Sequence, residues 1–220
     1  ARAGDRVYIA GGDYPLMEPL IWQDAAGAAI TGGYAGTATE GPGACDPAQW
    51  PTVIRRASGR STLRVMTIRN VTGSHLANVT IRDGFCERNY GRFPGAGIGI
   101  YDSSGLVISN CFVTNNMAVY STTGDDPYMG GGGIYAENSS GLLTHCRVFG
   151  NQIQESWYDH VLKGGGMQIE GGDWRVASCE FRDNMNGTLS YASRAKVYGG
   201  GLYLAGAADR LDVRHTVIAN

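Results

Sequence analysis

Several short stretches of this chain alternate apolar and polar residues with a period of two. Examples are the pairs Ile98/Ile100, Met167/Ile169 and Leu202/Leu204. Such alternation predicts a β-strand that buries one face, because successive side chains of a strand point to opposite sides of the sheet. No run of apolar residues follows the i, i+3, i+4 spacing of an amphipathic helix. The pattern therefore predicts an all-β chain.

The first third of the chain gives the same signal less regularly. The predicted strands there are residues 6–10, 19–22, 28–31, 53–54, 63–68 and 76–81. Residues 41–51 combine glycine and proline with Cys45 and predict a loop. Val79 and Ile81 occupy the positions that Cys111 and Val113 occupy in a later repeat. They therefore indicate one earlier coil, which lacks the glycine run of the later repeats.

One order of features recurs four times between residues 95 and 220. It consists of a glycine run, a short apolar strand, a polar turn, a second strand and a closing asparagine, and residues 130–151 show it in full. The strands after the glycine runs begin at Ile98, Ile134, Met167 and Leu202, which lie 36, 33 and 35 residues apart. A fixed period of this kind indicates a repeat architecture.

The residue types within each repeat decide what kind of repeat it is. Helical repeats of similar length exist, but a glycine inside a helix costs ~1 kcal/mol relative to alanine. Glycine runs instead suit turns that need positive φ or a close approach of two backbones. Each repeat is therefore predicted to be a coil of short strands. Stacked coils form a β-solenoid in which each coil buries its apolar face against its neighbours.

The repeats resemble a known superfamily. The glycine run followed by an apolar residue and tyrosine, the inward Cys-x-Val and the closing Gly-Asn or Asp-Asn are similar to the right-handed parallel β-helix repeats of the pectin-lyase-like superfamily. Residues 4–14, 30–34 and 51–54 resemble its first coils. The chain is most similar to secreted and surface-anchored bacterial β-helix proteins. The resemblance implies a right-handed parallel β-helix with loop insertions at one corner of each coil.

Composition and charge narrow the function classes. The chain has 220 residues and a formal net charge of −2 at pH 7, so charge favours neither nucleic acid nor an anionic membrane as a partner. No apolar stretch is long enough to span a membrane. We expect a single β-helix domain over residues 1–220. The start at Ala1 suggests a processed or trimmed end. Because no cap follows Val217, we expect either a longer native chain or copies that stack end to end into a filament.

Four loops are predicted at the same corner of successive coils, at residues 85–94, 117–129, 152–163 and 185–198. Insertions on one side of a solenoid often form its binding face. These loops carry the candidate ligand-binding residues Tyr128, Trp157, Tyr158 and Asp159. Two interpretations remain open, because the aromatic side chains could contact a ligand or could pack loop against loop.

The five cysteines divide into two groups. Cys111, Cys146 and Cys179 share one phase of the repeat, which predicts a buried column of free thiols rather than a disulfide or a zinc site. Cys45 and Cys86 fall outside this phase, in predicted loops. We expect these two cysteines to form a disulfide, which would fit a secreted protein.

The outward positions of the repeat strands supply the candidate chemistry. Counted from each strand start, Glu137 and Glu170 occupy the same position on successive coils and are the candidate catalytic residues. The candidate ligand-binding residues around them are Tyr101, Tyr135, Gln168 and Tyr203. Two adjacent carboxylates repel, which raises one pKa or recruits a cation. Beside aromatic rings, such a pair suits sugar binding or acid/base catalysis. The alternative is an exposed sheet face that tolerates two glutamates.

The sequence thus predicts a secreted or cell-surface β-helix module with a structural or adhesive role, which binds an extracellular polysaccharide or other surface glycan on the loop-walled face. The alternative is a polysaccharide lyase or glycoside hydrolase. The aspartate patterns of the superfamily's lyases and polygalacturonases are not found on the repeat strands, which favours binding over catalysis. No cofactor is implied. Calcium stays open as an alternative, but no motif implies it, because the calcium-binding GGxGxD repeat is absent from the sequence.

Overall fold

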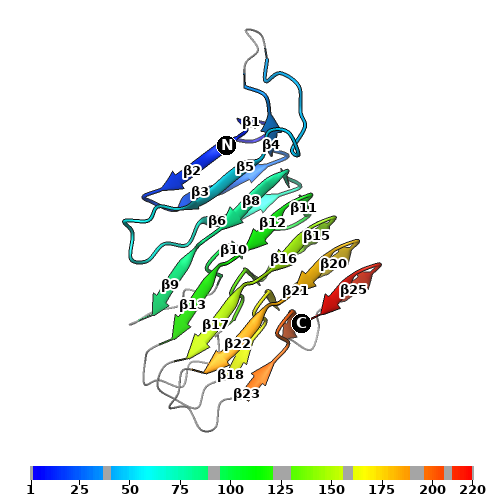
Figure 1. Ribbon diagram of the computed structural model, residues 1–220. Coiled ribbons are helices and arrows are strands. Elements are labelled where there is room, and N and C mark those ends of the chain that lie inside the picture. Colours follow the sequence, from blue (N-terminus) through cyan, green and yellow to red (C-terminus); the bar gives the residue numbers. More distant parts are fainter. Residues whose placement is uncertain are drawn as a thin grey trace.

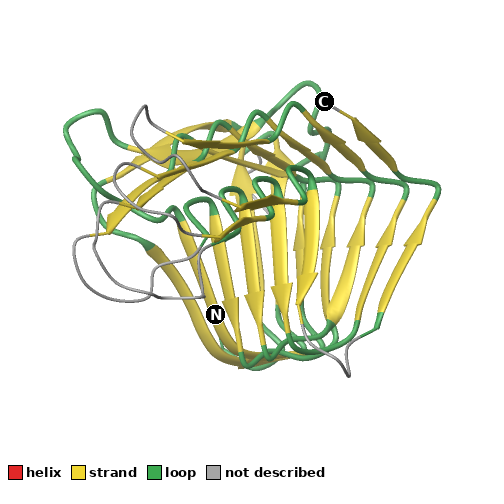
Figure 2. Ribbon diagram, turned by 90° about the horizontal axis from the view of Figure 1, so that it is seen from below, coloured by secondary structure: helices red, strands yellow, loops and turns green. Residues whose placement is uncertain are grey.

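The computed structural model describes residues 2–36, 41–88, 95–120, 130–155, 161–188, 196–205 and 210–219. These residues form parallel strands of successive coils that stack along one axis (Figure 1). Within the described ranges no helix is present, and short loops join the strands (Figure 2). The all-β parallel solenoid predicted from the sequence is therefore confirmed.

Three long sheets form the walls of the solenoid. Sheet I contains β3 (Leu20–Ala26), β6 (Met66–Thr72), β10 (Ile98–Tyr101), β14 (Ile134–Glu137), β19 (Met167–Glu170) and β24 (Leu202–Ala205). Sheet II contains β1 (Arg6–Ala10), β4 (Ala29–Tyr34), β7 (His75–Ala77), β11 (Leu106–Ser109), β15 (Gly141–Thr144), β20 (Trp174–Ala177) and β25 (Leu211–Arg214). Sheet III contains β2 (Gly12–Leu16), β5 (Thr52–Arg56), β8 (Val79–Arg82), β12 (Phe112–Thr114), β16 (Arg147–Phe149), β21 (Glu180–Arg182) and β26 (Val217–Ala219).

Two further sheets lie where the sequence predicted only loops. Sheet IV contains β9 (Phe85–Arg88), β13 (Met117–Tyr120), β17 (Gln152–Glu155) and β22 (Met185–Thr188). Sheet V pairs β18 (Val161–Lys163) with β23 (Lys196–Tyr198). Each predicted loop therefore begins as a strand. Stacking at the same phase allows these segments to bond to one another, and Ala118 and Ile153 bury a small core there with Ala96 and Leu162.

One continuous apolar core fills the interior of the solenoid. Inward side chains stack in columns, as in the register Ile54, Ile81, Val113, Val148 and Phe181 on sheet III. The last three follow the predicted column of thiols, two residues after Cys111, Cys146 and Cys179. Each is fully buried, which stabilises the fold by about 1.5–3 kcal/mol per side chain.

The corners depend on residues that adopt left-handed backbone conformations. Asn78, Asn110 and His145 stand directly before sheet III on successive coils, with φ of 58°, 51° and 52°. Short polar side chains tolerate this conformation better than branched apolar ones. Glycine is required elsewhere by close approach, because a Cβ on Gly133 would lie 2.6 Å from the carbonyl oxygen of Gly166.

A ladder of three buried asparagines runs through one corner. Asn116 donates from Nδ2 to Asn151 Oδ1 at 2.9 Å, and Asn151 donates from Nδ2 to Asn184 Oδ1 at 3.0 Å. Asn151 and Asn184 also donate to the main-chain oxygens of Val113 and Val148. The closing asparagines of successive repeats thus form hydrogen bonds with one another in the interior, and we call Asn116, Asn151 and Asn184 the asparagine ladder.

Cys111, Cys146 and Cys179 form a second buried column, here called the cysteine column. All three are free and at most 4% exposed, as predicted. The main-chain N–H of each of the first two donates to the sulfur of the next coil, at 3.5 and 3.4 Å. Hydrogen bonding between the sulfurs, together with burial, raises the pKa of the Cys146 and Cys179 thiols.

The predicted disulfide between Cys45 and Cys86 is wrong, because both cysteines are free. Cys45 lies in the segment that follows β4, where it forms a β-bridge with Tyr34 and where Asn78 Nδ2, next to the start of β8, donates to its sulfur at 3.7 Å. Cys86 belongs to β9, beyond the far end of β8. A strand of this length spans ~13 Å, whereas the Cα atoms of a disulfide lie within ~7 Å of each other.

Candidate functional site

Two columns of side chains point outward from sheet I, in the predicted register. The first column contains Thr67, Gly99, Tyr135, Gln168 and Tyr203. The second contains Arg69, Tyr101, Glu137, Glu170 and Ala205. The structure therefore brings the two candidate carboxylates onto adjacent strands, β14 and β19.

The two columns differ in exposure, which the sequence did not predict. Tyr135 is 1% exposed and Gln168 is fully buried, whereas Tyr101, Glu137 and Glu170 are half-buried. The glycine runs cover the first column. A Cβ on Gly130 would overlap Gln168 Oε1, and one on Gly131 would lie 2.8 Å from Tyr135 Cβ. A ligand can therefore reach the second column but not the centre of the first.

Tyr135 connects the two carboxylates from below. Its hydroxyl donates to Glu170 Oε2 at 2.8 Å, and Glu137 Oε2 lies 3.3 Å from the same oxygen. Glu137 Oε2 and Glu170 Oε2 therefore lie at most 6.1 Å apart, which is the sum of these two distances. One oxygen of each carboxyl group thus contacts the same hydroxyl, which brings the two acidic groups close together.

Burial changes the acidity of this group. The pKa of Glu170 is raised, because burial of the carboxylate outweighs the opposing effects of the Tyr135 hydroxyl, Lys163 and the Gln168 amide. Gln168 Nε2 donates to Glu170 Oε1. The pKa of Tyr135 is also raised, by burial and then by its hydrogen bond to Glu170. The arrangement therefore favours retention of a proton on both groups.

Cations lie on both sides of the carboxylates. The guanidinium carbons of Arg64 and Arg69 lie 5.4 and 5.3 Å from the centre of the Tyr101 ring. Lys163 Nζ lies 5.1 Å from the centre of the Tyr203 ring. None of these three residues was predicted from the sequence to belong to the site. Arg69 was detectable, because it occupies the phase of Tyr101 one coil earlier.

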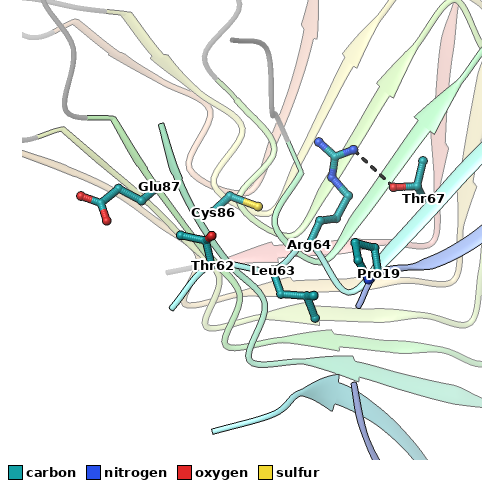
Figure 3. Close-up of a pocket in the computed structure, with 7 residues that line it drawn as sticks. All are labelled: Pro19, Thr62, Leu63, Arg64, Thr67, Cys86 and Glu87. Carbon is teal, nitrogen blue, oxygen red and sulfur yellow. Dashed lines mark hydrogen bonds between the residues drawn. The ribbon is translucent and has the colours of Figure 1, made fainter. Parts of the chain in front are cut away.

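A cavity of about 240 Å³ adjoins this face beside β6 (Figure 3). Arg64 and Thr67 line it together with Thr62, Cys86 and Glu87. Arg64 donates from Nη1 to Thr67 Oγ1 at 3.4 Å and from Nε to the main-chain oxygen of Gly95 at 2.9 Å. Burial raises the pKa of the Cys86 thiol against the opposing effect of Arg64. The cavity thus offers hydroxyl and guanidinium groups next to Tyr101.

Four of the predicted ligand-binding residues, Tyr128, Trp157, Tyr158 and Asp159, lie outside the described residues. Among the residues that the structure does describe, no group of three or more histidine, cysteine, aspartate or glutamate side chains is arranged to hold a metal ion. The same part of the chain contains no helix long and apolar enough to cross a membrane. On sheet III, Arg147 Nε and Glu180 Oε2 form an ion pair at 3.2 Å.

The fold and the stacked outward columns define a parallel β-solenoid protein. Comparison with family models agrees, because the model described as right handed beta helix region matches residues 56–218. The chain belongs to this right-handed β-helix family. Searches of curated proteins and of solved structures gave no match.

Proposed function

We propose that this chain is a secreted or cell-surface β-helix module with a structural or adhesive role, and that it binds an extracellular glycan along sheet I. The observation that carries the proposal is the half-exposed column of Arg69, Tyr101, Glu137 and Glu170 on four successive strands. Neighbouring positions are ~4.8 Å apart, so the column presents a regular series of polar groups and one aromatic ring.

The chemistry of this column suits a sugar chain. Carboxylates accept hydrogen bonds from hydroxyls, and guanidinium groups donate to hydroxyls or to ring oxygens. Tyr101 offers a half-buried ring on which the apolar face of a pyranose can pack. Because Tyr135 and Gln168 are buried, they hold Glu170 in place and do not contact the ligand.

A glycoside hydrolase or polysaccharide lyase is the second candidate. It is favoured by one observation, the Glu137 and Glu170 oxygens held within 6.1 Å by the Tyr135 hydroxyl. If the chain hydrolyses a glycan, two neighbouring carboxyl groups can divide the catalytic roles between them, with the raised pKa of Glu170 suited to the general acid. Binding is the first proposal because the sequence does not carry the superfamily's catalytic aspartate patterns.

The extracellular location is part of the proposal and rests on the resemblance to secreted and surface-anchored β-helix proteins. The expected disulfide no longer supports it, since Cys45 and Cys86 are free. Immunodetection of the native protein in medium, cell-surface and cytosolic fractions tests this part of the proposal. Recovery in the cytosolic fraction alone would contradict it.

A glycan array probed with the wild type and with Glu137→Gln, Glu170→Gln and Tyr101→Ala tests the binding site. Loss of a hydrogen bond to a charged group costs about 1.5–3 kcal/mol, so each glutamine variant should bind roughly tenfold more weakly or worse. Arg182→Gln on sheet III serves as the control and should bind like the wild type. Retained affinity in all three sheet I variants would place the site elsewhere. Assays for reducing ends and unsaturated products separate binding from turnover.

A further inference from the structure

A second concave surface lies at the corner between sheets II and III, away from the carboxylates of sheet I. It is an open groove of about 770 Å³ at the start of β8, β12 and β16. Its floor contains Asn78, Asn110, His145, Phe112 and Arg147, and its wall is the segment from Cys45 to Ala48. This segment follows β4, near the N-terminal end of the stack (Figure 1).

We propose that this groove binds a short, uncharged oligosaccharide that lies parallel to the axis of the solenoid. The proposal concerns a different face from sheet I and does not rest on the function proposed for that face.

The floor presents a row of planar polar groups in fixed positions. Asn78, Asn110 and His145 follow one another on adjacent coils, each held in a left-handed backbone conformation. Three positions at ~4.8 Å spacing cover ~10 Å along the axis. A side-chain amide offers both donors and acceptors. Asn78 Nδ2 donates to Cys45 Sγ at 3.7 Å and His145 Nδ1 bonds to Thr144 Oγ1 at 2.9 Å, which orients both side chains. Because sugar hydroxyls also donate and accept, two amides and an imidazole match them better than charged groups would.

Phe112 supplies the apolar part of the groove. Its side chain is 40% exposed on the outer face of β12. The guanidinium carbon of Arg147, on the next coil, lies over the ring at 5.8 Å from its centre, so both a cationic planar group and an aromatic ring line the groove. An exposed ring next to planar polar groups fits the C–H face of a pyranose with its hydroxyls directed sideways.

The wall of the groove is preformed. Tyr34 and Cys45 form an isolated β-bridge, and Asp46 donates from its main-chain N–H to the oxygen of Gly33 at 2.8 Å. Asp46 Oδ1 in turn accepts from the N–H groups of Ala48 and Gln49, at 3.0 and 3.3 Å. A wall that is already ordered loses little conformational entropy when a ligand binds.

Charge and strand pairing argue against the other classes of ligand. Arg147 pairs with Glu180 at 3.2 Å, and the Asp46 carboxylate is occupied by backbone N–H groups, so the groove has no large excess of either charge. An extended peptide binds by adding to an unpaired strand edge. Here β12 is bonded to a strand on each side, so the groove offers no such edge.

The test compares two exposed aromatic residues of sheet III. Phe112→Thr removes the ring in the groove and copies Thr80, which occupies the same position one coil earlier. Phe149→Thr removes a ring of similar exposure, 37%, outside the groove and copies Thr114. Each variant introduces a threonine, and a threonine already occupies the equivalent position on the neighbouring coil, so both variants should fold.

Calorimetric titration with neutral hexasaccharides of β-1,4-linked glucose, xylose and mannose and of α-1,4-linked glucose provides the readout. We expect the wild type to bind at least one of them, Phe112→Thr to weaken that binding at least tenfold, and Phe149→Thr to change it less than twofold. Asn110→Gly preserves the left-handed backbone and removes the amide, and it should also weaken binding.

Three results would overturn the inference. They are absence of binding to all four hexasaccharides, equal effects of Phe112→Thr and Phe149→Thr, and binding that is lost in Glu137→Gln but kept in Phe112→Thr. The last result would refute the groove while supporting the function proposed for sheet I. Loss through Phe112→Thr alone, with Glu137→Gln unchanged, would support the groove independently of sheet I.

Discussion

Replacing Asn151 by alanine removes the middle amide of the asparagine ladder. In the native structure Asn151 Oδ1 accepts from the main-chain N–H of Asn116 at 3.1 Å and from its Nδ2 at 2.9 Å. Asn116 is fully buried, so its main-chain N–H would remain without an acceptor, whereas its Nδ2 keeps the main-chain oxygen of Ile81 at 3.3 Å. An unsatisfied buried group costs about 1–3 kcal/mol, which is the expected loss of unfolding free energy.

A loss of this size is large against the stability of an ordinary domain, about 5–15 kcal/mol. For a chain of this length it corresponds to a melting temperature lowered by about 2–12 °C. Urea denaturation followed by far-UV circular dichroism measures the difference in unfolding free energy, and calorimetry gives the melting temperature.

Asn115→Gly is the matched control. Asn115 lies next to the ladder, but it is exposed and has φ of 54°, a conformation that glycine adopts without strain. Its replacement should change the unfolding free energy by less than about 1 kcal/mol. A loss below about 1 kcal/mol in Asn151→Ala, or an equal loss in both variants, would refute the reasoning that the ladder satisfies buried donors.

The remaining predictions concern packing, thiol access and pH. Gly133→Ala should destabilise the fold, because its Cβ would lie 2.6 Å from a carbonyl oxygen, whereas Gly59→Ala meets nothing within 4 Å and should be neutral in thermal melts. Native thiol labelling followed by mass spectrometry should modify exposed Cys45 first and leave the cysteine column protected, and rapid labelling of the column would contradict the register. The pKa of Glu170 is raised in the folded state, so the native carboxyl holds its proton more tightly than the unfolded one and stability is lost as pH rises through the native pKa. Glu170→Gln should therefore flatten the decline in melting temperature between pH 4 and pH 7, and an unchanged pH profile would contradict this account.

The stacked register was predictable because it depends on periodicity. Glu137 and Glu170 were placed on adjacent strands by counting from the glycine runs, and the cysteine column was assigned by its phase. A solenoid repeats one local geometry, so local sequence signals carry most of the information about its fold.

The exposure of the site was not predictable in the same way. Whether Tyr135 is exposed to solvent depends on how closely the glycine run that contains Gly131 packs over it. The periodicity of the sequence predicts the register of the strands but not the path of this run. Sheet IV was missed because strands such as β17 mix polar and apolar residues and have no marker of their own. Cys86 was assigned to a loop for the same reason, which led to the wrong disulfide.

The vertical alignment of the coils makes the length of this molecule adjustable in whole units. Ile134 pairs with Met167 on the next coil. Cys146 and Asn151 likewise hydrogen-bond to Cys179 and Asn184 on that coil. The segment from residue 134 to residue 166 is therefore one repeat whose two ends are equivalent. Excision of that segment would join Gly133 directly to Met167 and shorten the columns of sheets I to IV by one step, and it would also remove β18 from sheet V. Duplication would lengthen the columns by one step of ~4.8 Å. Such a chain can serve as a molecular ruler, whose span is set by the number of coils rather than by redesign of its core.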